Sequence, residues 1–152
     1  MSMFHSMNTT ASALTSQRLR MDVISSNMAN IDSTRATYVN GEWQPYKRKI
    51  AVFQPNQGQF SSFLDKAMNR TEGSAVGSGV KVTRIIDDET PNKLVYDPEH
   101  PDADQNGYVQ MPNVDPLREM VDLMSATRSY EANVTVFNAS KGMMMKALEI
   151  GK

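Results

Sequence analysis

Helix-breaking residues are confined to the middle of this chain. Residues 1–40 contain no glycine and no proline, and residues 117–141 again contain none. All seven prolines lie between Pro45 and Pro116, and six of the eight glycines lie between Gly41 and Gly107. Glycine costs about 1 kcal/mol and proline about 3 kcal/mol inside a helix. The distribution therefore predicts two long terminal helices that enclose a turn-rich middle.

The first segment carries a heptad pattern of apolar residues. Its seam is interrupted at Thr10 and Gln17 and is formed by Met7, Leu14, Met21, Ile24, Met28 and Ile31. Such spacing is typical of a helix that packs along one partner. We expect this helix to end near Asn30, because asparagine is a common helix terminator and Asp32, Ser33 and Thr34 favour a turn.

The last segment begins with a clear helix-start signal. Asp115 can cap the helix, and Pro116 suits the first helical position because its missing N–H has no intrahelical partner. Gly142 is a possible bend. Apolar residues then recur at helical spacing in what we call the apolar stripe: Leu117, Val121, Met124, Ala132, Val136, Ala139, Met143, Ala147 and Ile150.

A second apolar set lies off this stripe. It comprises Met120, Leu123, Val134, Phe137, Met144 and Leu148. One N-terminal helix cannot cover both faces, so the surplus predicts association between chains. An intramolecular antiparallel pair that caps a small domain is the alternative that periodicity leaves open.

The middle of the chain changes to a strand period. We predict strands over 50–53, 80–86, 93–96 and 108–110, with a flexible loop near 57–79. Residues 61–70 fit either a short helix or a mobile insertion. The expected fold class is α+β. Residues 1–40 with 114–152 would form a helical domain, with the helices paired in an antiparallel, coiled-coil-like unit, and 41–113 a β-rich module.

Composition and motifs exclude several function classes. A net charge of −1 gives no electrostatic footprint for nucleic acid, and the absence of cysteine excludes thiolate sites. No apolar run could span a membrane, and no secretory signal is evident at the start. No Gly-x-Ser-x-Gly, Gly-x-x-x-x-Gly-Lys or Gly-x-Gly-x-x-Gly motif occurs. We therefore expect no enzyme activity and no cofactor.

Two polar clusters remain to be weighed. From Asp102 the chain matches the first half of a calcium loop, but the twelfth position is Asn113 rather than glutamate. A proline-pinned acidic turn that leads into the strand at Tyr108 is the preferred interpretation, and no metal site is expected. Lys47, Arg48 and Lys49 form a basic run, which we interpret as a solvated strand face that could contact an acidic partner.

Two separated motifs resemble the bacterial flagellar rod and hook family. The first is Ser26-Asn27-Met28-Ala29-Asn30-Ile31, and the second is Gly107-Tyr108-Val109-Gln110-Met111-Pro112-Asn113-Val114-Asp115. The last helix adds Glu119-Met120-Val121-Asp122-Leu123-Met124 and Arg128-Ser129-Tyr130-Glu131-Ala132-Asn133. Within the family, the stretches Pro45-Tyr46-Lys47-Arg48 and 96–104 are similar to proximal-rod proteins. The resemblance covers essentially the whole chain.

The resemblance implies a structural subunit of the proximal rod, whose terminal helices pack into a tube around the export channel and transmit torque. It implies export by the flagellar type III apparatus without signal cleavage, and a place in the periplasmic rod. Implied partners are copies of the chain, proximal and distal rod proteins, the ring-to-rod adaptor and the rod cap protein. A helical adaptor or export-chaperone-like protein and a metal-dependent enzyme at the acidic loop are the competing hypotheses.

The predicted assembly interface draws on both ends of the chain and on the second motif. Its residues are Met7, Leu14, Met21, Ile24, Asn27, Met28, Asn30, Ile31, Tyr108, Pro112, Asn113, Val121, Met124, Arg128, Tyr130, Asn133, Val136, Phe137 and Met143.

Overall fold

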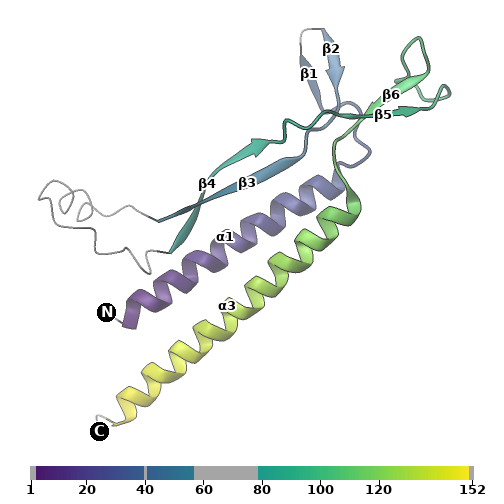
Figure 1. Cartoon of the computed structure of the whole chain (residues 1–152). Helices are drawn as coiled ribbons and strands as arrows, with labels where there is room; N and C mark the ends of the chain where they lie inside the picture. Colours follow the sequence, from purple (N-terminus) through teal and green to yellow (C-terminus); the bar gives the residue numbers. More distant parts are fainter. Residues whose placement is uncertain (1–2, 40, 57–78, 151–152) are drawn as a thin grey trace, which may run out of the picture. The chain divides into compact units, whose positions relative to one another are not determined.

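The computed structural model describes residues 3–39, 41–56 and 79–150. Within them, two long helices flank a middle of short strands (Figure 1). The first helix, α1, spans Met3–Ala29, and the last, α3, spans Pro116–Ile150. This arrangement confirms the predicted α+β fold class. Neither helix is long and apolar enough to cross a membrane. The predicted flexible loop near 57–79, apart from Gly79, and the ambiguous stretch 61–70 lie outside the described residues.

Both inner helix ends lie where the sequence predicts them. α1 ends at Ala29, and the Asn30 side chain donates a 2.8 Å hydrogen bond to the carbonyl of Ser26. At the start of α3, the Asp115 carboxylate accepts a 3.1 Å bond from the N–H of Leu117. The bond to Leu117 satisfies a backbone N–H that the helix start leaves without an intrahelical partner, whereas the Ser26 carbonyl also accepts a 3.2 Å bond from the N–H of Asn30. α3 continues as a helix through Gly142 to Ile150.

The described strands form three antiparallel pairs. β3 (Lys49–Pro55) pairs with β4 (Val80–Asp87), and backbone bonds join Asp88 N to Arg48 O and Asn56 N to Gly79 O. β5 (Lys93–Tyr96) pairs with β6 (Tyr108–Met111). All four strands were predicted, with ends that differ by at most two residues.

A third pair was missed by the sequence interpretation. β1 (Thr37–Val39) and β2 (Glu42–Gln44) form a hairpin in which Tyr38 lies opposite Trp43. Their ring centroids are 5.1 Å apart. Gly41, at φ 93°, supplies the left-handed turn residue. The three-residue strands are too short for periodicity to reveal, although the aromatic residues that flank Gly41 are a hairpin signal.

The acidic loop between β5 and β6 is a hydrogen-bonded turn. The N–H of Gly107 donates to Asp104 O at 2.8 Å, and the N–H of Asp104 donates to Tyr108 O at 2.9 Å. The carboxylate of Asp102 accepts bonds from Thr34 and Arg35. Its oxygens are therefore engaged by the segment that follows α1. This geometry agrees with the preferred interpretation, a turn that leads into the strand at Tyr108.

The chain divides into two compact units, each containing parts of both helices. The first unit combines Met1–Leu19, Phe53–Thr83 and Thr127–Lys152. Within it, α1 contacts the first residue of β4 through two serines. Ser12 Oγ accepts a 3.1 Å bond from Val80 N, and Ser16 Oγ donates a 3.2 Å bond to Val80 O. Gly79 allows this approach, because a Cβ there would lie 2.5 Å from Ser12 Oγ.

The second unit combines Arg20–Val52 and Arg84–Ala126. Its buried apolar side chains are Val23, Ile24, Val109, Val114 and Ala126. The end of α1 lies against the start of α3 in antiparallel sense, because Arg20 pairs with Asp122 at 3.2 Å while Asn27 bonds Glu119 at 3.1 Å. Inside this unit the predicted antiparallel pairing of the helices is therefore present.

Candidate assembly interface

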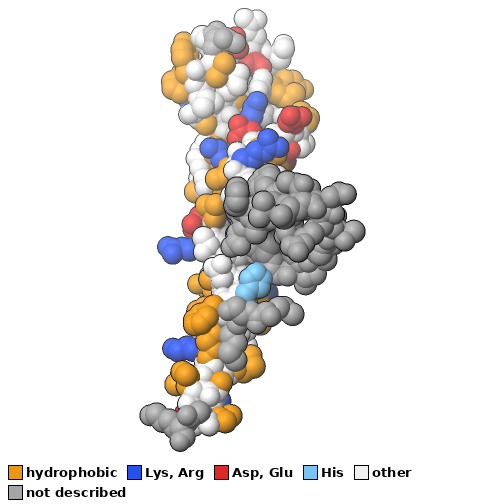
Figure 2. Space-filling model, turned by 90° about the vertical axis from the view of Figure 1, so that its left-hand side faces the viewer, with side chains coloured by type: hydrophobic (Ala, Val, Ile, Leu, Met, Phe, Trp, Pro, Cys, Tyr) orange, Lys and Arg blue, Asp and Glu red, His pale blue; other side chains and the backbone are white. Residues whose placement is uncertain are grey.

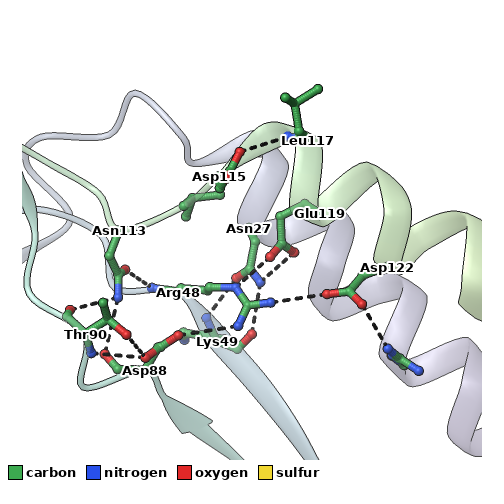
Figure 3. Close-up of polar contacts among 12 residues, drawn as sticks. Asn27, Arg48, Lys49, Asp88, Thr90, Asn113, Asp115, Leu117, Glu119 and Asp122 are labelled. Atoms are coloured by element: carbon green, nitrogen blue, oxygen red, sulfur yellow. Dashed lines mark hydrogen bonds and ion pairs between the residues drawn. The ribbon is translucent and has the colours of Figure 1, made fainter.

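The most buried polar group of the second unit is the carboxylate of Glu119. Its side chain is fully buried in the first turns of α3, beside Arg48, the residue just before β3. Arg48 Nε donates a 2.6 Å bond to Glu119 Oε1, and its terminal nitrogens lie 3.4 Å from Asp88 and from Asp122 (Figure 3). One guanidinium thus joins a strand, a loop and a helix through three carboxylates.

Asn27 completes this arrangement from α1. Its Nδ2 donates to Glu119 Oε2 at 3.1 Å and to the carbonyl of Lys49 at 2.9 Å. Its Oδ1 accepts from the N–H of Lys49 at 2.9 Å and from the hydroxyl of Tyr46 at 3.0 Å. These four bonds use the two donors and two acceptor sites that an amide side chain offers. Asn27 therefore fits only one placement of β3 against α1.

Asn113 ties the segment before α3 to the same place. Its Oδ1 accepts a 2.8 Å bond from the N–H of Arg48, and its Nδ2 donates to the carbonyl of Thr90 at 3.0 Å. The six side chains that meet here are called the polar junction: Asn27, Arg48, Asp88, Asn113, Glu119 and Asp122 (Figure 3). Five separate segments of the second unit are joined by it.

The charges of the polar junction stabilise one another. Burial of the guanidinium lowers the pKa of Arg48, but the hydrogen bond and the charge of Glu119, with those of Asp88, outweigh it and hold the pKa above its ordinary value. Hydrogen bonds from Thr90, followed by Arg48, lower the pKa of Asp88. Both shifts favour the charged forms of Arg48 and Asp88.

The structure corrects the interpretation of the basic run. Lys47 and Lys49 are exposed, but Arg48 between them is buried and bonded to Glu119. Successive residues of an extended chain point to opposite sides, so the middle residue of the run points inward. Arginine suits this position because its planar fork can bond several carboxylates at once.

The predicted apolar stripe of α3 lies on the exposed side of the helix. All nine of its residues are exposed, including Val121 at 60% and Met143 at 62%. The buried and half-buried side chains recur on the other side, at Glu119, Leu123, Ala126, Tyr130, Asn133, Phe137, Ser140 and Met144. Hydrophobic side chains accordingly appear at the molecular surface among the charged ones (Figure 2).

The predicted interface residues fall into three groups by exposure. The buried ones are Ile24, Asn27 and Pro112. The half-buried ones are Met7, Leu14, Met21, Met28, Asn30, Ile31, Asn113, Tyr130, Asn133 and Phe137. The exposed ones are Tyr108, Val121, Met124, Arg128, Val136 and Met143. Asn27 and Asn113 make bonds inside the second unit, whereas the exposed apolar members lie on the stripe.

Sequence analysis missed Arg48 and Glu119 as functional residues. A signal for Glu119 was present, because it is spaced by four and then three residues from Leu123 and Ala126, both on the covered side of α3. A glutamate on that side requires a buried cation, and nothing in the linear sequence says which basic residue supplies it. Among the described residues, no cluster of three or more carboxylates and histidines is arranged to hold a metal ion.

Comparison with known proteins identifies both ends of the chain. Residues 7–37 match the family described as flagella basal body rod protein, and residues 105–150 match the family described as flagellar basal body rod FlgEFG protein C-terminal. The matched ranges include Asn27 and, in the second, Asn113 and Glu119. The polar junction therefore draws on both matched regions and on Arg48 and Asp88 between them.

Full-length relatives give the same result. The flagellar basal-body rod protein FlgC of Bacillus subtilis is 62% identical over all 152 residues, which is the whole of both chains. FlgC of Borreliella burgdorferi is 43% identical over 99% of this chain and 98% of its own length. FlgC of Escherichia coli O6:H1 is 47% identical over 93% of this chain and 92% of its own length.

Proposed function

Because the chain belongs to the FlgC family of flagellar basal-body rod proteins, it is a structural subunit of the flagellar rod. We propose that the apolar stripe of α3 is the main surface through which this subunit contacts its neighbours. The observation that carries this proposal is the exposure of all nine stripe residues. Apolar side chains in such a row, on one face of a long helix, are a costly surface in water and mark a contact site.

The polar side of α3 supports the same division of roles. Inside the second unit, the carboxylates of Glu119 and Asp122 join α3 to α1 and to Arg48 just before β3, and Ala126 is the buried apolar residue of this part of α3. The larger apolar residues face outward instead, at Leu117, Val121 and Met124. The start of α3 thus directs Glu119 and Asp122 inward and these apolar groups outward, which is suited to burying the apolar groups against other chains.

Val121→Asp tests this proposal directly. Burying an unpaired carboxylate in a contact between chains costs roughly 3 kcal/mol, about a hundredfold in each incorporation step. We expect loss of swimming and no rods in basal-body preparations from a strain that carries the variant as its sole copy. The circular dichroism spectrum of the purified chain should remain unchanged, because Val121 is 60% exposed.

Asn138→Asp is the matched control. It adds the same charge to the same helix, at an exposed polar position further along the chain. Around the helix axis, this position is rotated by about a quarter turn from Val121. Swimming and rod recovery should remain near the parental level. Normal swimming of the Val121→Asp strain would contradict the assignment of the stripe.

The finer assignments belong to the same proposal. We infer that the subunit lies in the proximal rod within the periplasm, that the terminal helices form a tube around the export channel, and that this tube transmits torque. The same inference covers export by the type III apparatus and contacts with the ring-to-rod adaptor, the rod cap and other rod proteins. It includes no enzymatic role. The support for it is the resemblance of the chain to proximal-rod proteins and the stripe available for several neighbours.

A further inference from the structure

The apolar contacts between α1 and α3 in the second unit specify their relative position only weakly. The buried apolar side chains there are Val23 and Ile24 from α1 and the small Ala126 from α3. Apolar contacts are not directional, so these side chains constrain the register of the two helices less strictly than hydrogen bonds do. A directional interaction is therefore needed to select one register of α1 against α3.

The polar junction is directional where the apolar contacts are not. Glu119 is fully buried, and its two oxygens accept bonds from Arg48, just before β3, and from Asn27 on α1. A shift of α3 by one residue or by one turn would remove this carboxylate from both donors. A buried charge without a partner is strongly penalised, so shifted pairings are excluded.

Asn27 extends this selection to the strand. Because its amide bonds both the N–H and the C=O of Lys49, the position of β3 along α1 is fixed as well. Arg48, the neighbour of Lys49, then reaches Glu119 with its Nε at 2.6 Å. The helix α1 positions the strand, and the strand positions the start of α3.

We propose that Arg48 and Glu119, with Asn27, are positioning residues that fix the register of α1, β3 and α3, and that the Arg48–Glu119 ion pair contributes register rather than net stability. Replacing a buried ion pair by apolar residues of similar size is often neutral or stabilising, whereas a single polar residue in a helical interface can specify its register. The consequence for the rod rests on the proposed function. A subunit with one register presents its apolar stripe to every neighbour in one geometry.

The distinguishing experiment is a distance measurement in the purified full-length chain. The chain has no cysteine, so the exposed positions Asp22 on α1 and Ser125 on α3 can be changed to cysteine and spin-labelled. Pulsed electron resonance then reports the distribution of distances between the labels. We expect one narrow maximum in this background. In Arg48→Met with Glu119→Leu, we expect several maxima or a distribution about twice as wide, with the urea midpoint retained.

A second ion pair in the same chain provides the matched control. Arg128 and Glu131 lie 3.8 Å apart on the exposed surface of α3, and Arg128→Met with Glu131→Leu makes the same kind of exchange there. This control should leave the distance distribution unchanged. If the buried exchange retains the fold and also leaves the distribution unchanged, the proposal is overturned. A broad distribution in the labelled parent would overturn it equally.

Arg48→Lys decides the matter if the apolar exchange does not fold. Lysine keeps the charge but loses the planar fork that joins Glu119 to Asp88 and Asp122. A wider distribution in this variant supports the proposal, and an unchanged one contradicts it. The measurement uses the isolated chain, so it is independent of rod incorporation, which Val121→Asp tests. Failure of this proposal and failure of the proposed function are therefore distinguishable.

Discussion

Replacing Asn27 by leucine should lower the stability of the fold more than the same replacement at Asn8, the other asparagine of α1. The side chain is 1% exposed and makes four hydrogen bonds, with the N–H and C=O of Lys49, the Glu119 carboxylate and the Tyr46 hydroxyl. Each neutral bond contributes about 1 kcal/mol, and the bond to the carboxylate about 2 kcal/mol. Tyr46 is half-buried and also lies 3.5 Å from Ser26 Oγ, so its bond is replaceable. The expected loss is about 4 kcal/mol.

Hydrogen exchange provides a local measurement of this loss. In Asn27→Leu the amide of Lys49 loses its acceptor, so its exchange, followed by nuclear magnetic resonance, should accelerate together with a drop in the urea midpoint seen by circular dichroism. The control is Asn8→Leu, at an exposed asparagine of the same helix, for which we expect a change within about 0.5 kcal/mol. A loss below about 1 kcal/mol in Asn27→Leu would refute the reasoning, because the four bonds would then contribute nothing beyond their exchange with water.

Two further predictions concern the turns. In urea unfolding, Gly79→Ala should destabilise the chain by roughly 1 kcal/mol more than Gly41→Ala. Both glycines have positive φ, but only at Gly79 would the new Cβ meet Ser12 Oγ, at 2.5 Å. Equal losses of stability in the two variants would contradict the close approach of Gly79 to Ser12. The hydrogen bond from Arg35 is the main reason that the pKa of Asp102 lies below its usual 3.8. Because folding lowers this pKa, the charged carboxylate adds stability that is complete above the ordinary pKa of 3.8 and is lost as the pH falls through the folded pKa. The loss of stability that Asp102→Asn causes at neutral pH should therefore disappear in acid. A loss that persists at pH values well below 3.8 would count against this ion pair.

The positions of the elements could be predicted because their signals are local. The lack of breakers sets the helices, Asp115 and Pro116 fix the start of α3, and β-branched and aromatic residues mark four of the strands. Which side of α3 is covered is a different question. Periodicity gives two apolar faces on that helix without stating which one the chain itself covers. The structure shows that the side with fewer large apolar residues, at Glu119 and Ala126, is the covered one.

The polar junction could not be predicted, because its members are distant in sequence. Arg48 and Glu119 are separated by 71 residues, and Asn27 and Glu119 by 92. A buried ion pair offers no periodic pattern, and each member alone has an ordinary surface interpretation. The residues nevertheless lay inside recognised motifs, Asn27 in the first and Asn113 in the second. The sequence does not reveal that Asn27 and Asn113 bond to other segments of the same chain rather than to a neighbouring subunit.

The motifs and the stripe together suggest why a rod subunit needs a charged interior. An apolar seam between α1 and α3 would compete with the contacts between subunits, because either apolar face of α3 could then pack in either place. With Glu119 buried against Arg48, the covered side is selective for one internal partner. Val121 and Met124 on the exposed side cannot replace Glu119, because neither carries a carboxylate for Arg48 to bond. α3 therefore uses a charged face for packing within the chain and an apolar face for contacts between subunits. If the junction residues were apolar, the first function lost should be the choice of which face of α3 packs against α1.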